Sequence, residues 1–152
     1  MLDAIAWTFN KTPYTNNAIF NEQVTEYQIK IFETADKWQP TEIIIDLSQV
    51  YIQYQAWIKG KQDLLANEEL TAEDLDYVTN TEPYEDEYGY QVDILAKLQA
   101  DNGQHFTAIE LLQKTHNQMV NKELGDHVFF EGFGEEFESH ADLPIYYVGC
   151  GS

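Results

Sequence analysis

Residues 41–60 of the chain, TEIIIDLSQVYIQYQAWIKG, decide its fold class. Apolar side chains recur there at steps of three and four residues, which is the spacing of one face of a helix. This stripe consists of Ile43, Leu47, Val50, Tyr54 and Trp57. The β-branched run at residues 43–45 is more typical of a strand. Because the stripe continues for about four helical turns and Gly60 can end a helix, the pattern as a whole predicts a helix.

The segments on either side extend this helical interpretation. Residues 18–38 show the same apolar spacing, and Pro40 stops the helix that they predict. The connection to residues 41–60 is short, so the two helices are expected to pack as an antiparallel hairpin. Residues 92–98 predict one further helix.

Two capping signals predict the starts of other helices. Thr71 stands three residues before Asp74, and Thr107 stands three residues before Glu110. A hydroxyl at the first position and an acid three residues later form a capping box, which satisfies free backbone N–H groups at a helix start. We therefore expect a short helix after Thr71 and a longer one after Thr107.

The last thirty residues change to a β pattern. Residues 127–131 (HVFFE) and 145–148 (IYYV) are rich in β-branched and aromatic side chains and are bounded by Gly or Pro. They are predicted to pair across an acidic loop. The chain has no internal repeat and no linker, so residues 1–152 predict a single α+β domain, predominantly helical, with a short C-terminal antiparallel β-hairpin.

The composition limits the classes of function. The chain has 8 Lys, no Arg and 27 Asp or Glu, which gives a net charge of −19 and argues against binding nucleic acid through its phosphates. No apolar run approaches the ~20 residues of a membrane helix. The first residues lack the basic region of a secretory signal, and the single cysteine excludes an internal disulfide framework. We expect a cytoplasmic protein that binds neither a membrane nor nucleic acid.

The acidic charge is concentrated in two segments. Residues 62–96 carry eleven acids and no Lys, and residues 123–152 carry seven acids and no Lys, whereas residues 1–61 have a net charge of only −2. Like charges repel, and folding does not require such a concentration. The segments are therefore either a solvated surface that keeps the protein soluble or a binding footprint for a basic partner.

Tyrosines between the acids of the first segment favour the binding interpretation. Tyrosine supplies a large rigid contact area with a polar tip, while carboxylates attract and pair with Lys and Arg of a partner. The predicted contact residues are Glu82, Tyr84, Glu85, Asp86, Glu87 and Tyr88 in the first segment and Glu135, Glu136 and Glu138 in the second.

Signals for catalysis are weak, and we expect neither enzymatic activity nor a cofactor. His127 and Glu131 lie four residues apart on a predicted strand, and with His140 they could form a two-histidine, one-carboxylate metal site, but this spacing matches no known motif. Cys150 stands between two glycines near the end of the sequence, which is a poor setting for a nucleophile. The chain also lacks Arg, the usual residue for holding an anionic substrate.

This small acidic chain, with capped helices, a segment of tyrosines and carboxylates and no catalytic motif, resembles the immunity proteins of bacterial polymorphic and contact-dependent toxin systems. The resemblance is one of overall character along the whole chain and assigns no site residue. It implies a cytoplasmic protein that binds and neutralises a basic cognate toxin, such as a nuclease. Two alternatives are a DNA mimic that occupies a DNA-binding protein and a metal-dependent enzyme that uses His127, Glu131 and His140.

Overall fold

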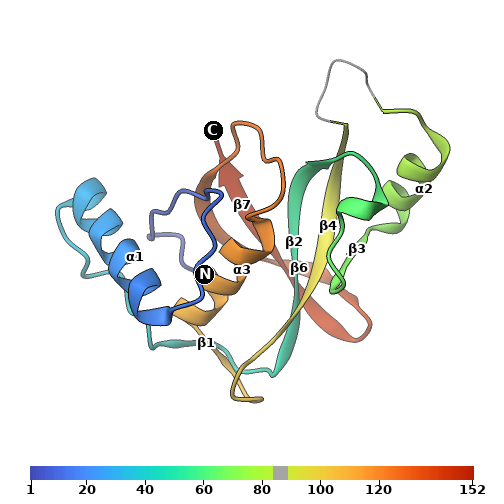
Figure 1. Cartoon of the computed structure of the whole chain (residues 1–152). Helices are drawn as coiled ribbons and strands as arrows, with labels where there is room; N and C mark the ends of the chain where they lie inside the picture. The colour runs from blue at the N-terminus through green and yellow to red at the C-terminus, as the bar shows by residue number, and fades with distance from the viewer. Residues whose placement is uncertain (84–88) are drawn as a thin grey trace.

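A computed structural model describes residues 1–83 and 89–152, with the backbone alone for residues 136–138. A five-stranded sheet with the strand order β3-β4-β2-β7-β6 forms the centre of the molecule, and a two-stranded sheet pairs β1 with β5 (Figure 1). The strands are β1 (Ile43–Ile45), β2 (Gln49–Ile58), β3 (Glu68–Leu70), β4 (Tyr90–Gln99), β5 (Phe106–Thr107), β6 (Phe129–His140) and β7 (Leu143–Gly151). The helices are α1 (Asn17–Phe32), α2 (Ala72–Asn80) and α3 (Ala108–Met119), with a 3-10 turn η1 (Lys61–Asp63).

The predominantly helical fold expected from the sequence is wrong. Residues 43–58 form β1 and β2 instead of a helix, and residues 92–98 lie in β4. Every second side chain of β2 is buried on one face of the sheet, as the alternation of a strand requires; these residues are Val50, Ile52, Tyr54, Ala56 and Ile58. The C-terminal β-hairpin is also longer than the short hairpin predicted from the sequence. Its strands β6 and β7 make up two of the five strands of the main sheet.

The capping signals did predict helix starts, and these are confirmed. The hydroxyls of Thr71 and Thr107 accept hydrogen bonds from the backbone N–H groups of Asp74 and Glu110, at the starts of α2 and α3. α1 begins at Asn17, one residue before its predicted start, and ends earlier than predicted, at Phe32. None of the helices in residues 1–83 and 89–152 has the length and apolar character needed to cross a bilayer.

The main core lies between the helices and one face of the five-stranded sheet, called here the inner face (Figure 1). Inner-face side chains of β2 and β4 form one buried cluster with residues of α1 and α3. The helical members of this cluster are Phe20, Val24, Ala108, Leu111, Leu112 and Met119. Burial of this apolar surface is the main force that holds the helices on the sheet.

The opposite face of the sheet, called the outer face, is covered at one end by the chain itself. Tyr51, Leu95 and Ile145 form a second buried cluster there, against Leu143. The ring of His140, at the end of β6, lies edge-on to Tyr51 with 4.8 Å between ring centroids. The tip of the β6–β7 hairpin therefore bends across the outer face, from one edge of the sheet toward the other.

Both edges of the main sheet have partners. Residues 1–9 run along β6, and backbone hydrogen bonds of 2.8–2.9 Å join them to residues 128–133. At the opposite edge of the sheet, β3 pairs with only part of β4. The part of β4 that β3 does not reach is contacted by α2, where the Asp74 carboxylate accepts a hydrogen bond of 2.7 Å from the backbone N–H of Asp93. Covered edges limit unwanted pairing with other chains.

Candidate functional site

The predicted contact residues fall only partly within the described chain. Tyr84, Glu85, Asp86, Glu87 and Tyr88 lie outside the described residues. Glu136 and Glu138 belong to β6, but their side chains are not described. Among the predicted contact residues, the structure therefore describes the side chains of Glu82 and Glu135 and the surfaces around them.

Glu82 and Glu135 each stand beside a tyrosine. Both carboxylates are exposed to solvent. The pKa of Tyr90 is raised by burial first and then by the negative charge of Glu82. Burial and then the charge of Glu135 raise the pKa of Tyr146 in the same way. Each of these exposed carboxylates thus lies near a tyrosine, but Tyr90 is buried and Tyr146 is half-buried.

The two acidic segments meet at one contact but do not form a single face. The meeting point is a contact between Nε2 of His140 in β6 and Oε1 of Glu69 in β3. The register of the sheet places Glu69 opposite Leu95, on the outer face. Glu135 pairs with Tyr146, whose neighbour on β2 is the inner-face residue Ile52. The carboxylates of the two segments are therefore distributed over both faces of the sheet.

Lysines neutralise few of the surface acids. Between described residues, lysine side chains form two ion pairs with carboxylates, Lys114 with Asp101 and Lys122 with Glu68, each at 2.8 Å. The second pair is buried, so it removes nothing from the surface charge. Exposed carboxylates are attached to α2, to β3 and to β6. Negatively charged side chains on helices and strands are thus exposed at the surface of the molecule.

The buried pair belongs to a polar cluster beneath α3. The side chains of Glu68 and Lys122 are 0% and 1% exposed. Glu68 also accepts hydrogen bonds from the backbone N–H of Leu65, at 2.8 Å, and from the hydroxyl of Tyr54. Burial and the neighbouring carboxylate raise the pKa of that hydroxyl far above its usual range. Because both side chains are buried, the cluster fixes β3 to the end of α3 and presents no charged group to a substrate.

The three residues considered for a metal site have separate partners. His127 Nδ1 lies 2.8 Å from Asp126 Oδ1, and both residues are exposed. His140 pairs with Glu69, while Glu131 lies over Gly151 of β7. Within residues 1–83 and 89–152, no three His, Cys, Asp or Glu side chains form a group able to hold a metal ion.

His116 is a buried polar residue whose role the sequence did not indicate. Its Nδ1 accepts a hydrogen bond from Trp7 Nε1 at 3.1 Å, and its Nε2 donates to the carbonyl of Thr12 at 2.8 Å. This assignment of the proton to Nε2 follows from the Trp7 donor. Burial lowers the pKa of His116. The neutral ring therefore ties the N-terminal segment to α3 and does not reach a solvent-exposed site.

Cys150 is protected from reaction. Burial, followed by the charge of Glu131, raises the pKa of its thiol to about 12. The thiolate is the reactive form of cysteine, so a pKa this high leaves almost none of it at neutral pH. The side chain is a packing residue beside the main core.

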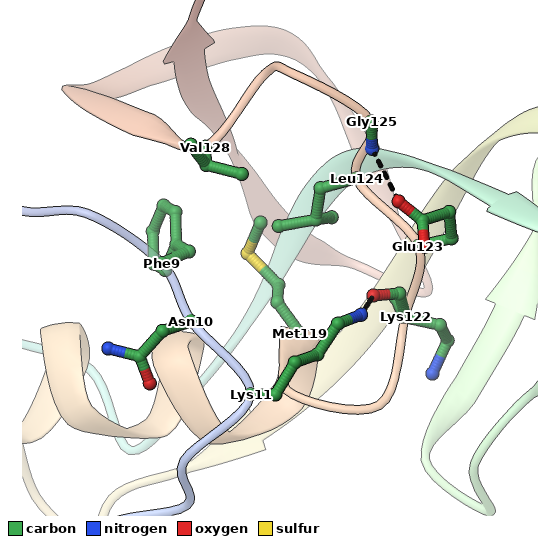
Figure 2. Close-up of a pocket in the computed structure, with 9 residues that line it drawn as sticks. All are labelled: Phe9, Asn10, Lys11, Met119, Lys122, Glu123, Leu124, Gly125 and Val128. Carbon is green, nitrogen blue, oxygen red and sulfur yellow. Dashed lines mark hydrogen bonds between the residues drawn. The ribbon is translucent and has the colours of Figure 1, made fainter.

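Figure 2 shows a small cavity between residues 9–11, the end of α3 and the loop before β6. Its volume is about 70 Å³, and Phe9, Met119, Leu124 and Val128 supply apolar walls. Its polar groups already bond one another. The Lys11 amine donates to the carbonyl of Lys122, and the Gly125 N–H donates to Glu123 Oε1 at 3.0 Å. The cavity is a gap in the packing, with no polar group directed at a ligand.

Comparisons of the chain with models of protein families, with curated proteins and with solved structures found no match. The functional interpretation therefore rests on the geometry and the charge described above. The described chain has exposed carboxylates on α2, β3 and β6, and few of them are paired with lysine.

Proposed function

We propose that this chain is a non-enzymatic acidic protein that binds and neutralises a basic protein partner. It would act as an immunity protein that inhibits a cognate toxin, and this toxin would have a basic surface like that of a nuclease. The observation that carries the proposal is the surface charge. Carboxylates are exposed on α2, β3 and β6, while only two lysine–carboxylate pairs join described residues and one of these is buried.

The physical advantage of such a surface is in association. Carboxylates held on helices and strands create a negative potential that attracts a basic protein before contact, which raises the association rate by about 10–10³-fold at low salt. The half-buried Tyr146, next to Glu135, adds contact area once the two proteins meet. A partner that binds nucleic acid must itself be basic, so the same surface can block its active groove.

The proposal is tested by identifying the genes next to this one and purifying any basic protein with a toxin domain that they encode. We expect a complex by size-exclusion chromatography and loss of toxin activity when the two purified proteins are mixed. The association rate should fall at least tenfold between about 50 and 500 mM NaCl, because salt screens the attraction. Absence of a complex at low salt would contradict the proposal.

Charge reversals identify the contact region in the same assay. Glu82→Lys and Glu135→Lys should each slow association more than Glu42→Lys, because Glu42 is an exposed acid of the nearly neutral first 61 residues. Each variant changes the net charge by the same amount, so a difference between them reports position alone. Equal slowing by all three would show that the net charge alone attracts the partner.

A further inference from the structure

A second cleft, larger than the cavity of Figure 2, lies between α1 and the N-terminal segment. Its volume is about 270 Å³. Residues 7–14 supply one wall and residues 23–30 of α1 supply the other. α1 lies at the opposite end of the molecule from α2, whose carboxylates belong to the proposed partner surface (Figure 1). Pockets for drug-sized ligands measure roughly 300–1,000 Å³, so a ligand of this cleft must be small.

Three aromatic rings line the cleft. The rings of Tyr14 and Tyr27 each meet the ring of Trp7 edge-on, with interplanar angles of 63° and 68° and centroid distances of 6.2 and 5.8 Å. Trp7 is buried, whereas the two tyrosines are half-buried. A hydrogen bond of 2.5 Å joins the hydroxyl of Tyr27 to that of Thr8. Both walls of the cleft therefore offer aromatic surface to a ligand.

Hydrogen bonds from α3 hold these rings in place. Trp7 Nε1 donates to His116 Nδ1 at 3.1 Å. The backbone N–H of Tyr14 donates to the side chain of Asn117 at 2.8 Å, and its carbonyl accepts from the side chain of Gln113 at 2.9 Å. A site fixed in this way is formed before a ligand arrives, so binding costs little free energy for ordering the protein.

Two opposite charges border the same cleft. Glu26 and Lys30 lie one helical turn apart on α1, and both are exposed and line the cleft. Within residues 1–83 and 89–152, neither side chain forms a hydrogen bond or an ion pair with another residue. Residues at this spacing on a helix can pair with each other, but these two do not. A carboxylate and an ammonium group are thus both free to meet a ligand.

We infer that this cleft binds a free amino acid with an aromatic or apolar side chain. Glu26 binds the ammonium group of the ligand, Lys30 binds its carboxylate, and its side chain packs against the rings of Tyr14 and Tyr27. The ring faces of the tyrosines add to the attraction for the ammonium group. A ligand with one charge alone would be repelled by the cleft residue of like charge. The inference goes beyond the proposed function and does not depend on it.

Titration of the full chain with L-phenylalanine and L-leucine tests this site. Concentrations up to about 10 mM detect dissociation constants in the millimolar range. The indole N–H signals are followed by NMR. The signal of Trp7, which lines the cleft, should shift, and that of Trp57 on β2 should not.

Two analogues of L-phenylalanine separate the contributions of its charges. Phenethylamine lacks the carboxylate, and 3-phenylpropionate lacks the ammonium group. Each should bind about threefold to fivefold more weakly than L-phenylalanine, which is the usual effect of losing one exposed charge pair.

Substitutions on α1 assign these charges to residues. Glu26→Gln should weaken binding of L-phenylalanine by the same factor but should not weaken binding of 3-phenylpropionate, which has no ammonium group. Lys30→Gln should weaken binding of L-phenylalanine but not of phenethylamine. Glu22→Gln is the matched control, because Glu22 is exposed on α1 but does not line the cleft, and it should leave binding unchanged. Circular dichroism of the three variants checks that the fold is intact.

A shifted Trp7 signal, preference for L-phenylalanine over both analogues and losses confined to the Glu26 and Lys30 variants support the inference. Equal binding of L-phenylalanine and its analogues would overturn it, as would equal losses in Glu22→Gln and Glu26→Gln. Absence of a Trp7 shift with both amino acids would also overturn it. The proposed function would stand in each case, because its test is the complex with a basic protein.

Discussion

Replacing Lys122 with methionine tests whether the buried ion pair holds the sheet to the end of α3. Methionine retains most of the side-chain volume but removes the ammonium group. The Glu68 carboxylate, 0% exposed and 2.8 Å from Lys122 Nζ, would then remain buried without its cation. Breaking a buried pair from one side costs about 3–5 kcal/mol. For a domain of this length, such a loss should lower the unfolding temperature by roughly 6–20 °C.

The assay is urea unfolding at neutral pH, followed by tryptophan fluorescence and circular dichroism. Glu68→Gln alone should cost a similar amount, because it leaves the ammonium of Lys122 buried. In the double variant the neutral amide can still accept the hydrogen bond from the Leu65 N–H, which is 2.8 Å in the present structure. The double variant should therefore be more stable than the sum of the single losses predicts, by about 2 kcal/mol or more.

Lys114→Met is the matched control. Lys114 forms an ion pair with Asp101 at the same 2.8 Å, but these side chains are 28% and 75% exposed. An exposed pair contributes at most about 1 kcal/mol. Two results would refute the reasoning that burial makes the Lys122 pair important. One is an equal loss of stability in Lys114→Met and Lys122→Met. The other is a double variant whose loss of stability equals the sum of the losses in Lys122→Met and Glu68→Gln.

Three further predictions concern buried or crowded positions. Burial lowers the pKa of His116 below its ordinary 6.5, so the unfolded chain takes up the proton first as the pH falls. As the pH falls through about 6.5, the protein should therefore lose more stability than a His116→Gln variant. Equal pH dependence of the two proteins in urea unfolding would contradict this. Burial raises the pKa of the Cys150 thiol to about 12. This thiol should therefore react with iodoacetamide at least about a hundredfold more slowly in the folded protein than in urea. Similar rates in the two conditions would show that the thiol is accessible in the folded protein. Gly132→Ala should lower the free energy of unfolding by about 2–3 kcal/mol, because Gly132 has a φ of 102° and a Cβ atom there would collide with Asp3. Gly103→Ala is the control: Gly103 has a φ of 70° and open space around it, so the loss should be about 1 kcal/mol. Similar losses in the two variants would show that the contact with Asp3 is unimportant.

The helix starts could be predicted from the sequence because they depend on neighbouring residues. Thr71 and Thr107 bond to groups three residues away, and no other part of the chain needs to be known. The strands at residues 43–58 and 92–98 could not be separated from helices in this way. Their identity depends on partners far along the chain, such as β7 beside β2.

The error at residues 41–60 has a specific physical cause. The inner-face residues of β2, such as Val50, Ile52 and Tyr54, alternate as expected for a strand. Tyr51 breaks the alternation because it is buried on the outer face beneath the hairpin tip. Apolar residues on both faces can be spaced like a helical stripe. Recognising a strand there would have required knowing that residues 140–145 fold back over it.

The candidate site could be predicted only in part, for a related reason. The excess of acids was visible in the sequence, and Glu82 and Glu135 are indeed exposed beside tyrosines. Gln53, Gln55 and Gln91 could not be placed on one face of a sheet, because they belong to two strands that the helical interpretation did not contain. A period of two in the polar residues, as at Gln53 and Gln55, is the signal that could have found them.

The position of β7 in the sheet has a consequence for biosynthesis. Strands β2, β3 and β4 can pair while the chain is still on the ribosome, but β7, residues 143–151, is inserted between β2 and β6. Residues 1–9 also remain without their strand partner until β6 has been made. Such non-local pairing delays folding. An unfinished chain would therefore lack a complete sheet, so the native fold should form only after residues 143–151 have been translated.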